Sequence, residues 1–537
     1  MTSRPSRERW LVARSRPAPT RSLGLCLLAA LLPSCADSAD PSAPANVVRD
    51  SGTTPDATSP APSPTPPPGT PPAPPPAPPA PAPPGPPPSL DDVAPSVACP
   101  AGAEAAFAAA ADAFAAALAR DAIPGGALGM LCGGERIFVR TVGVAQPGGS
   151  AIDADTRFQI ASTTKTLTGL TAATMAAEGL LSLDASIESL VTGVQARHLD
   201  GRPPTLEELL SHSAGVPPSV PGWSFETDSL EGLFALNARI TLLSPPGAVW
   251  NYANYGFSLA GLALERTAGA PFGSLVERYA MAPAGMTRAT MDSNRVLTEG
   301  NFAYGHSDDN GRTTPIGPLD WYYHQGHYAP TGGAWTSVTD LLALARHLIR
   351  RERIDSPGAT SVSRPRIRTT YPGRSYGLGL FVDPDGNHPW WSHGGSVGGF
   401  LTSLDVIPDL GFAVVWVMNG DWPSQDDGDY YPVYALASQL TDYDPGPYEE
   451  PRPGDPMEWS GTYEDPVVLG AMTVRTRVGG AEIVWSDGSV SPIEVQWRDG
   501  GYAMVPGEEY PVSVYFWRDE TGAIRYLVTD LGVGVRR

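Results

Sequence analysis

A proline-dominated segment restricts where this chain of 537 residues can fold. Residues 36–98 are rich in Pro and Ala, and 20 prolines lie between Pro55 and Pro88. Proline lacks a backbone donor and has a fixed φ, so this segment favours extended polyproline II over a helix or a central strand. We expect residues 36–98 to be a disordered tether that acts as a semi-rigid spacer. Binding to a Pro-recognition module is the alternative.

The residues before the tether have the pattern of a signal peptide. An Arg-rich start leads into an apolar run over 23–32, about half of the roughly 20 residues that a membrane-spanning helix needs. The following Pro33-Ser34-Cys35 completes a resemblance to a bacterial lipobox, in which the Cys is acylated, although Pro33 is untypical. Residues 1–35 therefore predict export, with Cys35 as the candidate lipidation site. We expect a periplasmic or cell-envelope lipoprotein, or a secreted protein if Cys35 is not acylated.

Charge and ligand-type residues exclude several classes of function. The net charge is −21 and the isoelectric point is about 4.7, which argues against a nucleic-acid partner. Four Cys and eight His, with no Cys pair at metal-ligand spacing, argue against a metal site, and no cofactor is predicted. In an oxidising compartment Cys99 and Cys132 could form a disulfide, and two separate buried thiols are the alternative.

Strand patterns occur at both ends of residues 99–443, and helical patterns dominate the middle. This order indicates one sheet that is closed by the two ends of the domain, with a helical insertion between them. The expected helices are 102–120, 162–178, 205–211, 255–268, 338–350 and 432–441, and the expected strands are 128–132, 137–142, 157–160, 400–407 and 412–418.

A second, smaller domain is predicted after a Pro- and Glu-rich linker over 444–456. Residues 457–537 alternate as in strands, for example over 472–478, 483–485 and 514–517, which favours a small antiparallel β-barrel-like domain. It contains no His, Cys or Lys. We therefore expect it to shape or support a site and not to supply catalytic groups.

The chain uses 35 Arg but a single Lys, Lys165. Ser162 lies three residues earlier, so a helix that begins at Ser162 places both side chains on one face. A serine hydroxyl needs a base to become a nucleophile, and a buried Lys can be neutral whereas Arg cannot. The helix N-terminus also favours an anion that forms beside Ser162. Alone, this spacing arises by chance in about one Lys in fifteen.

Two further motifs follow in order, namely Tyr252-Ala253-Asn254 and His393-Gly394-Gly395-Ser396. Together with the segments over 179–184, 209–217 and 331–340, they resemble the serine β-lactamase and penicillin-binding protein superfamily over about residues 100–442. The resemblance is to its class C-like branch of D,D-carboxypeptidases, D-aminopeptidases and esterases. It implies an α/β (α+β) fold with an antiparallel sheet flanked by helices and an all-helical insertion.

The resemblance also implies catalytic roles. Ser162 would be the nucleophile that becomes acylated, and Lys165 would take its proton. Tyr252 would act as general acid or base for the leaving group and for the attacking water. The backbone N–H groups of Ser162 and Ser396 would form the oxyanion hole.

Substrate-binding roles are implied for Asn254 and for the segment from His393 to Ser396. Asn254 would hydrogen-bond the substrate amide and Lys165. His393 stands where many β-lactamases have Lys, and a His is only partly charged at neutral pH, which weakens attraction for a β-lactam carboxylate. Gly394, Gly395 and Ser396 would line the substrate beside it. The sequence therefore favours a peptidase or esterase over an efficient β-lactamase.

Several other patterns could mark functional sites, but none of them predicts a further catalytic or metal site. Residues 394–398 match the G-x-S-x-G elbow of α/β-hydrolases, but a β-rich run follows and no His comes after His393. His324 and His327 lack a nearby carboxylate or Cys, so a metal site there is not expected. Residues 308–311 predict a turn and not a calcium loop. The aromatic segment 321–323 either lines the cleft or packs under a loop, and His212 is expected to order a loop.

These observations predict an exported serine hydrolase that cleaves an amide or ester of a small-molecule or peptide substrate through an acyl-enzyme on Ser162. A non-catalytic protein that binds cell-wall peptides or a partner protein through the same cleft is one alternative. A true β-lactamase is another. The membrane is expected as a partner only through a lipid anchor, and the sequence leaves the oligomeric state open.

Overall fold

The structure is a computed structural model that describes residues 97–197, 201–218, 220, 229–309, 312–317, 326–355, 358–371, 373–383, 386–420, 432–444, 456–465, 469–477, 480–497, 502–505, 512–519, 521–529 and 532–537. The predicted signal peptide, Cys35 and the tether up to residue 96 lie outside these ranges. Within them, no helix has the length and apolar character that crossing a membrane requires.

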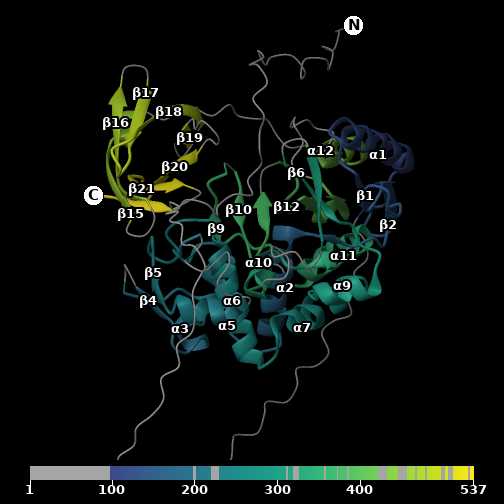
Figure 1. The fold of residues 1–537 in the computed structure, drawn as a ribbon, viewed down its shortest axis with the longest axis horizontal. Coiled ribbons are helices and arrows are strands. Elements are labelled where there is room, and N and C mark those ends of the chain that lie inside the picture. The colour runs from purple at the N-terminus through teal and green to yellow at the C-terminus, as the bar shows by residue number, and fades with distance from the viewer. Residues whose placement is uncertain are drawn as a thin grey trace, which may run out of the picture. The chain divides into compact units, whose positions relative to one another are not determined.

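An eight-stranded sheet organises the larger domain (Figure 1). Its strands pair antiparallel in the order β2, β1, β14, β13, β12, β11, β10, β9. Leu128 of β1 lies opposite Trp416 of β14, so the predicted closure of one sheet by the two ends of the domain is confirmed. The strands are β1 (Gly125–Cys132), β2 (Arg136–Gly143), β9 (Ile367–Arg368), β10 (Ser375–Tyr376), β11 (Phe381–Asp383), β12 (Trp390–Val397), β13 (Phe400–Ile407) and β14 (Phe412–Met418).

Different helices cover the two faces of this sheet, because β14 alternates between two cores. Trp416 packs in one core with α1 and α12, whereas its neighbours Val415 and Val417 pack in the other with α2 and α11. Each such buried side chain stabilises the fold by about 1.5–3 kcal/mol, so a strand that is apolar on both faces needs a helical layer on each. The covering helices are α1 (Ala103–Arg120), α2 (Thr164–Ala177), α11 (Val338–Asp355) and α12 (Pro432–Leu440).

The region between β2 and β9 is mainly helical, as predicted, but it is not purely so. It also contains three two-stranded sheets, β3 with β8, β4 with β5 and β6 with β7. The helices are α3 (Ile187–Leu190), α4 (Leu206–Leu210), α5 (Leu230–Leu236), α6 (Asn254–Ala268), α7 (Phe272–Val276), α8 (Ala282–Ala284), α9 (Ser293–Glu299) and α10 (Ala329–Gly332). The strands are β3 (Phe158–Gln159), β4 (Gln195–Arg197), β5 (Arg239–Thr241), β6 (Gly305–Asp309), β7 (Arg312–Ile316) and β8 (Trp335–Thr336).

The C-terminal domain is a closed antiparallel barrel, as the alternating pattern predicted. Large side chains fill its interior: Trp459 at the end of α13 (Pro456–Trp459) stacks on Phe516 with ring centroids 4.7 Å apart, and Tyr463 lies beside them. Its strands are β15 (Gly461–Asp465), β16 (Gly470–Arg477), β17 (Gly480–Val484), β18 (Val490–Trp497), β19 (Tyr502–Val505), β20 (Val512–Arg518), β21 (Ile524–Thr529) and β22 (Val533–Arg536).

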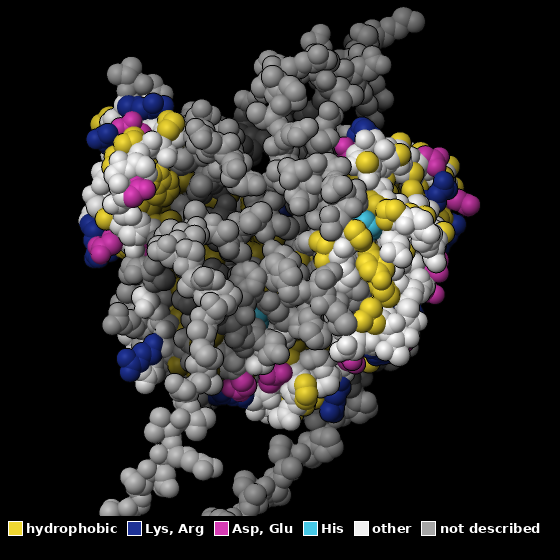
Figure 2. All heavy atoms as spheres, viewed as in Figure 1, with side chains coloured by type: hydrophobic (Ala, Val, Ile, Leu, Met, Phe, Trp, Pro, Cys, Tyr) yellow, Lys and Arg dark blue, Asp and Glu magenta, His cyan; other side chains and the backbone are white. Residues whose placement is uncertain are grey.

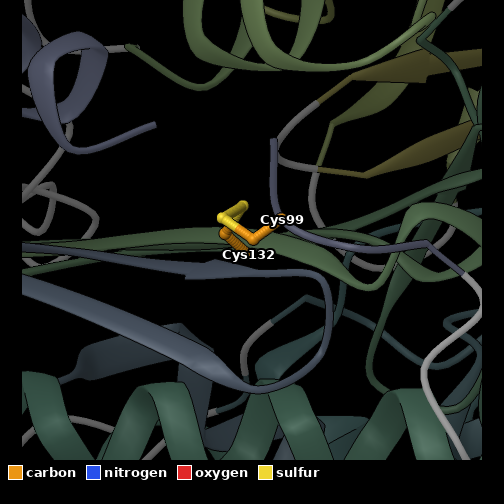
Figure 3. Close-up of a disulfide and its surroundings, with 2 residues drawn as sticks. All are labelled: Cys99 and Cys132. Carbon is orange, nitrogen blue, oxygen red and sulfur yellow. A yellow bond between two sulfur atoms is a disulfide. The ribbon is translucent and has the colours of Figure 1, made fainter. Parts of the chain in front are cut away.

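A disulfide joins Cys99 to Cys132, which decides between the two alternatives that the sequence left open (Figure 3). Cys132 is the last residue of β1, and Cys99 precedes α1. The bond therefore ties the first described residues of the chain to the central sheet.

On the face in Figure 2, the described basic and acidic side chains are interspersed around the rim.

Candidate active site

The predicted nucleophile lies on a tight turn and not at the first residue of an α-helix. Residues Ala161–Thr163 form a 3₁₀ turn that links β3 to α2, which begins at Thr164 and not at Ser162 as expected. Ala161 has φ +46°, a left-handed conformation that costs energy for a residue with a Cβ. This bend leaves Ser162 half-buried while both of its neighbours are buried.

Lys165 is completely buried one turn after Ser162. Its Nζ lies 3.1 Å from Ser162 Oγ and donates to the carbonyl oxygen of Thr331 at 3.0 Å. Burial lowers the pKa of Lys165 well below its usual value, and the described residues provide it with no ion pair. The amine is therefore suited to accept a proton from Ser162.

Thr331 is a partner of Lys165 that the sequence analysis did not assign. It lies in α10, far from Lys165 in the chain, and contributes its backbone carbonyl and not its side chain. A role of the backbone leaves no signature in residue type. The only sequence signal was the family resemblance of the segment over 331–340.

Tyr252 lies beside Lys165 and belongs to the loop that precedes α6. Its ring centroid lies 4.8 Å from Lys165 Nζ, and that of Phe257 lies 5.6 Å away. Burial raises the pKa of Tyr252, and a hydrogen bond with Ser162 acts in the opposite direction. Tyr252 therefore keeps its proton at neutral pH, as a group that protonates a leaving group must.

Asn254 is the first residue of α6 and is half-buried. Its Oδ1 is buried and has no hydrogen-bond partner in the described part of the chain. Lys165 instead bonds to Ser162 and Thr331, so the expected bond between Asn254 and Lys165 is not observed. The carboxamide oxygen remains available to a substrate N–H, which is the other role predicted for Asn254.

Strand β12 lies directly against the nucleophile turn. Thr402 Oγ1, on neighbouring β13, donates to the carbonyl oxygen of Ile160 at 3.0 Å. A Cβ on Gly395 would lie 2.2 Å from that same carbonyl, so only glycine allows this approach. Ser396 is half-buried and Gly394 is exposed beside it. The predicted pairing of the Ser162 and Ser396 N–H groups in an oxyanion hole stays a prediction.

His393 is buried and both of its ring nitrogens are engaged. Nδ1 contacts the carbonyl oxygen of Gly394 at 2.7 Å and must therefore donate, so Nε2 accepts from the hydroxyl of Tyr376 at 2.8 Å. Burial lowers the pKa of His393 to about 3. The imidazole is thus neutral at physiological pH, whereas the sequence suggested partial charge.

The remaining candidates divide between described and undescribed residues. Residues 321–324 lie outside the described ranges, and His327 is buried in the turn Gly326–Tyr328. Among the described His, Cys, Asp and Glu side chains, no group of three is placed to hold a metal. Ser396 lies within β12 and is followed by β13 and not by a helix, so the α/β-hydrolase elbow is excluded.

Comparison with known proteins identifies the fold and its family. A family model described as Beta-lactamase matches residues 110–439. The chain belongs to the beta-lactamase family. The family resemblance predicted from the three motifs is therefore confirmed, together with the antiparallel sheet and its flanking helices.

The relatives with similar sequences are named for different activities. Penicillin-binding protein 4 of Amycolatopsis lactamdurans is 24% identical over 363 residues, which cover 64% of this chain and 93% of that protein. D-aminopeptidase of Cereibacter sphaeroides is 24% identical over 356 residues, 64% of each protein. Esterase EstB of Burkholderia gladioli is 29% identical over 173 residues, 28% of this chain and 43% of the esterase.

Solved structures agree on the fold. SurE has a TM-score of 0.63 at 23% identity, over 81% of this chain and all of that chain. A class C beta lactamase from Rhodobacter sphaeroides has a TM-score of 0.52 at 19% identity, over 62% of this chain and 99% of that chain.

Proposed function

We propose that this protein hydrolyses an amide or ester through an acyl-enzyme on Ser162. The observation that carries the proposal is the completely buried amine of Lys165, 3.1 Å from Ser162 Oγ. Burial lowers the pKa of this amine well below its usual value and so favours its neutral form, and a neutral amine at hydrogen-bond distance is a competent base for a serine. Membership of a family whose members are serine hydrolases supports the same activity.

Acylation passes the proton of Ser162 to the leaving group through Lys165 and Tyr252. Lys165 accepts the proton of Ser162 Oγ as the oxygen attacks the substrate carbonyl carbon. Tyr252 protonates the leaving amine or alkoxide and recovers a proton from the Lys165 ammonium. Water then attacks the acyl-enzyme, gives a proton to the same groups, and Ser162 Oγ regains its hydrogen.

The neutral His393 favours a peptidase or esterase over an efficient β-lactamase. Its two ring nitrogens bond to Tyr376 and to its own strand, so it offers no fixed positive charge to a substrate carboxylate. The relatives named D-aminopeptidase and esterase agree with this preference. A penicillin-binding protein is the second candidate, and the relative with that name supports it.

A protein that binds cell-wall peptides without cleaving them is disfavoured by the intact site. Ser162, Lys165 and Tyr252 lie together, and burial favours the neutral form of the Lys165 amine that the chemistry needs. Burying an amine without an ionic partner costs free energy. A protein that only binds its ligand would have no reason to retain such a buried lysine.

We further propose that the protein is exported and anchored to the cell envelope through Cys35. The Arg-rich start, the apolar run over 23–32 and the Cys at its end support this location. The disulfide between Cys99 and Cys132 is compatible with an oxidising compartment. Mass analysis of the mature N-terminus tests the proposal, because an acylated Cys35 would be the first residue.

The activity is tested by intact-mass analysis after exposure to a fluorophosphonate, a penicillin and a short-chain p-nitrophenyl ester. We expect a fluorophosphonate adduct on Ser162 and ester turnover, both of which Ser162→Ala should remove, with turnover reduced by about four orders of magnitude. A stable penicillin adduct would favour the penicillin-binding protein. If the wild type is neither labelled nor active on any of them, the proposed function is wrong.

A further inference from the structure

The loop that carries Tyr252 has little secondary structure to hold it. Tyr252 precedes α6, and the residue at the helix start, Ala253, provides no side-chain cap. Yet proton transfer by Tyr252 requires a hydroxyl that is fixed within a fraction of an ångström. The feature that fixes this loop comes from a distant part of the chain, at His212.

His212 contacts the loop on both sides of Tyr252. The backbone carbonyl oxygen of His212 accepts from the N–H of Asn251 at 2.8 Å, and His212 Nδ1 accepts from the N–H of Ala253 at 3.0 Å. The imidazole also packs on the Tyr252 ring, with centroids 4.3 Å apart and planes at 38°. One residue thus holds the two neighbours of Tyr252 and its ring.

The backbone of His212 is itself strained. It has φ +60° and is only 2% exposed, and a left-handed conformation at a residue with a Cβ costs energy. Glycine would relieve this strain but would lose the ring and the acceptor. A strained residue that supplies three contacts to a candidate catalytic loop is better explained by a role in the site than by packing alone.

The contacts also define the form of the imidazole. Because Nδ1 accepts a hydrogen bond, the ring is neutral with its proton on Nε2. The rings of Trp250, Phe257 and Tyr376 surround it at 4.8–6.0 Å, which excludes water. Burial lowers the pKa of His212 well below its usual value.

We infer that His212 is a positioning residue that holds the Tyr252 hydroxyl in place for proton transfer, an inference that rests on the proposed function. His212 does not itself carry the proton. Its Nδ1 is occupied by Ala253, and Nε2 has no hydrogen-bond partner in the described part of the chain, so no path leads from the ring to Ser162 or Lys165. A neutral ring also adds no positive charge beside Lys165 when that amine takes its proton.

The experiment compares two readouts that depend differently on Tyr252. Fluorophosphonate labelling of Ser162 expels fluoride, which needs no general acid, whereas turnover of p-nitrophenyl acetate requires deacylation by water. We expect His212→Phe, which keeps a ring but leaves the Ala253 N–H unpaired, to lower ester turnover about tenfold or more. Its labelling rate should stay within about threefold of wild type.

A double-mutant cycle tests whether the effect passes through Tyr252. In a Tyr252→Phe background, adding His212→Phe should lower turnover by no more than about twofold further. Fully additive losses, or labelling that falls in parallel with turnover, would overturn the inference. If the wild type is not labelled at Ser162, the proposed function fails instead, so the two failures are distinguishable.

A second pair of variants keeps the test decisive if His212→Phe does not fold. Asn tolerates a left-handed backbone and keeps an acceptor near the Nδ1 position, so His212→Asn should retain at least about fivefold more turnover than His212→Ala. Equal losses would contradict the inference. His347→Asn is the matched control, because His347 is also a buried histidine but lies on α11, and its turnover should equal that of wild type.

Discussion

The central sheet and the C-terminal barrel are both antiparallel, but they differ in the size of the side chains at particular positions: glycine on β12 and large aromatic rings inside the barrel. Strand β12 of the sheet carries Gly394 and Gly395, and the missing Cβ of Gly395 lets its backbone lie against the nucleophile turn. The barrel instead fills its interior with rings such as Trp459, Tyr463 and Phe516. The backbone of β12 thus lies beside the candidate nucleophile, whereas the described interior of the barrel serves packing.

The same secondary structure thus serves catalysis or stability, according to what its inner face holds. Lys165 is buried beside the sheet at a cost in free energy, as expected for a functional group. Substitutions in the larger domain should therefore change activity most, and those inside the barrel should change stability alone.

The largest expected effect is that of Lys165→Met. Without a base, turnover should fall by about three orders of magnitude or more. The folded state should nevertheless become more stable, because a buried amine without an ion pair is replaced by an apolar side chain. Turnover of the p-nitrophenyl ester and denaturant unfolding measure the two effects.

The stability of the Lys165→Met variant should also differ from that of wild type in its pH dependence. The pKa of Lys165 is lowered in the folded state. At pH values between this lowered pKa and the ordinary lysine pKa of about 10.4, the unfolded chain therefore binds one proton more than the folded chain. Wild-type stability therefore gains from this group as pH rises from the lowered folded value to the unfolded value, and Met removes that gain. Ser162→Ala, which keeps the lysine, should retain the wild-type slope, and identical slopes in all three proteins would mean that Lys165 is charged in the fold.

Next in size is Trp459→Ala in the barrel. Trp459 is fully buried and stacks on Phe516, so truncation should lower the unfolding free energy by about 3–5 kcal/mol. At temperatures where the barrel stays folded, kcat/KM should remain within about twofold of wild type. Met457→Ala, in the same short helix and 72% exposed in wild type, is the matched control for stability. A loss of kcat/KM in the folded Trp459 variant would show that the barrel takes part in catalysis.

The smallest effect is expected from a methyl group on β12. Gly395→Ala places a Cβ 2.2 Å from the Ile160 carbonyl oxygen, so the strand must shift, at a cost of about 1–3 kcal/mol in unfolding free energy. In Gly394→Ala the nearest atom to the new Cβ lies 3.7 Å away, and stability should change by less than about 0.5 kcal/mol. Denaturant unfolding of the pair measures the difference, and equal losses would contradict the close approach of β12.

Most of the longer elements were predictable from the sequence, and so was the short strand β3 within the predicted strand 157–160, but several other short or strained elements were not. The helices at 205–211, 255–268, 338–350 and 432–441 and the strands at 400–407 and 412–418 were found close to their predicted bounds. The two- and three-residue strands β9, β10 and β11 were missed, because so few residues show no period. The predicted helix start at Ser162 was wrong, since a left-handed Ala161 has no recognisable signature.

Groups that lie close along the chain were predictable from the residues alone. Ser162 and Lys165 lie one turn apart, and the alternation of residues 457–537 indicated a barrel, because both follow from local backbone periods. Which distant groups meet became clear only from the packing of the folded chain. Thr331 bonds to Lys165, Tyr376 bonds to His393, and His212 bonds to both neighbours of Tyr252. Such contacts depend on how separate elements pack and leave no trace in the spacing of residues.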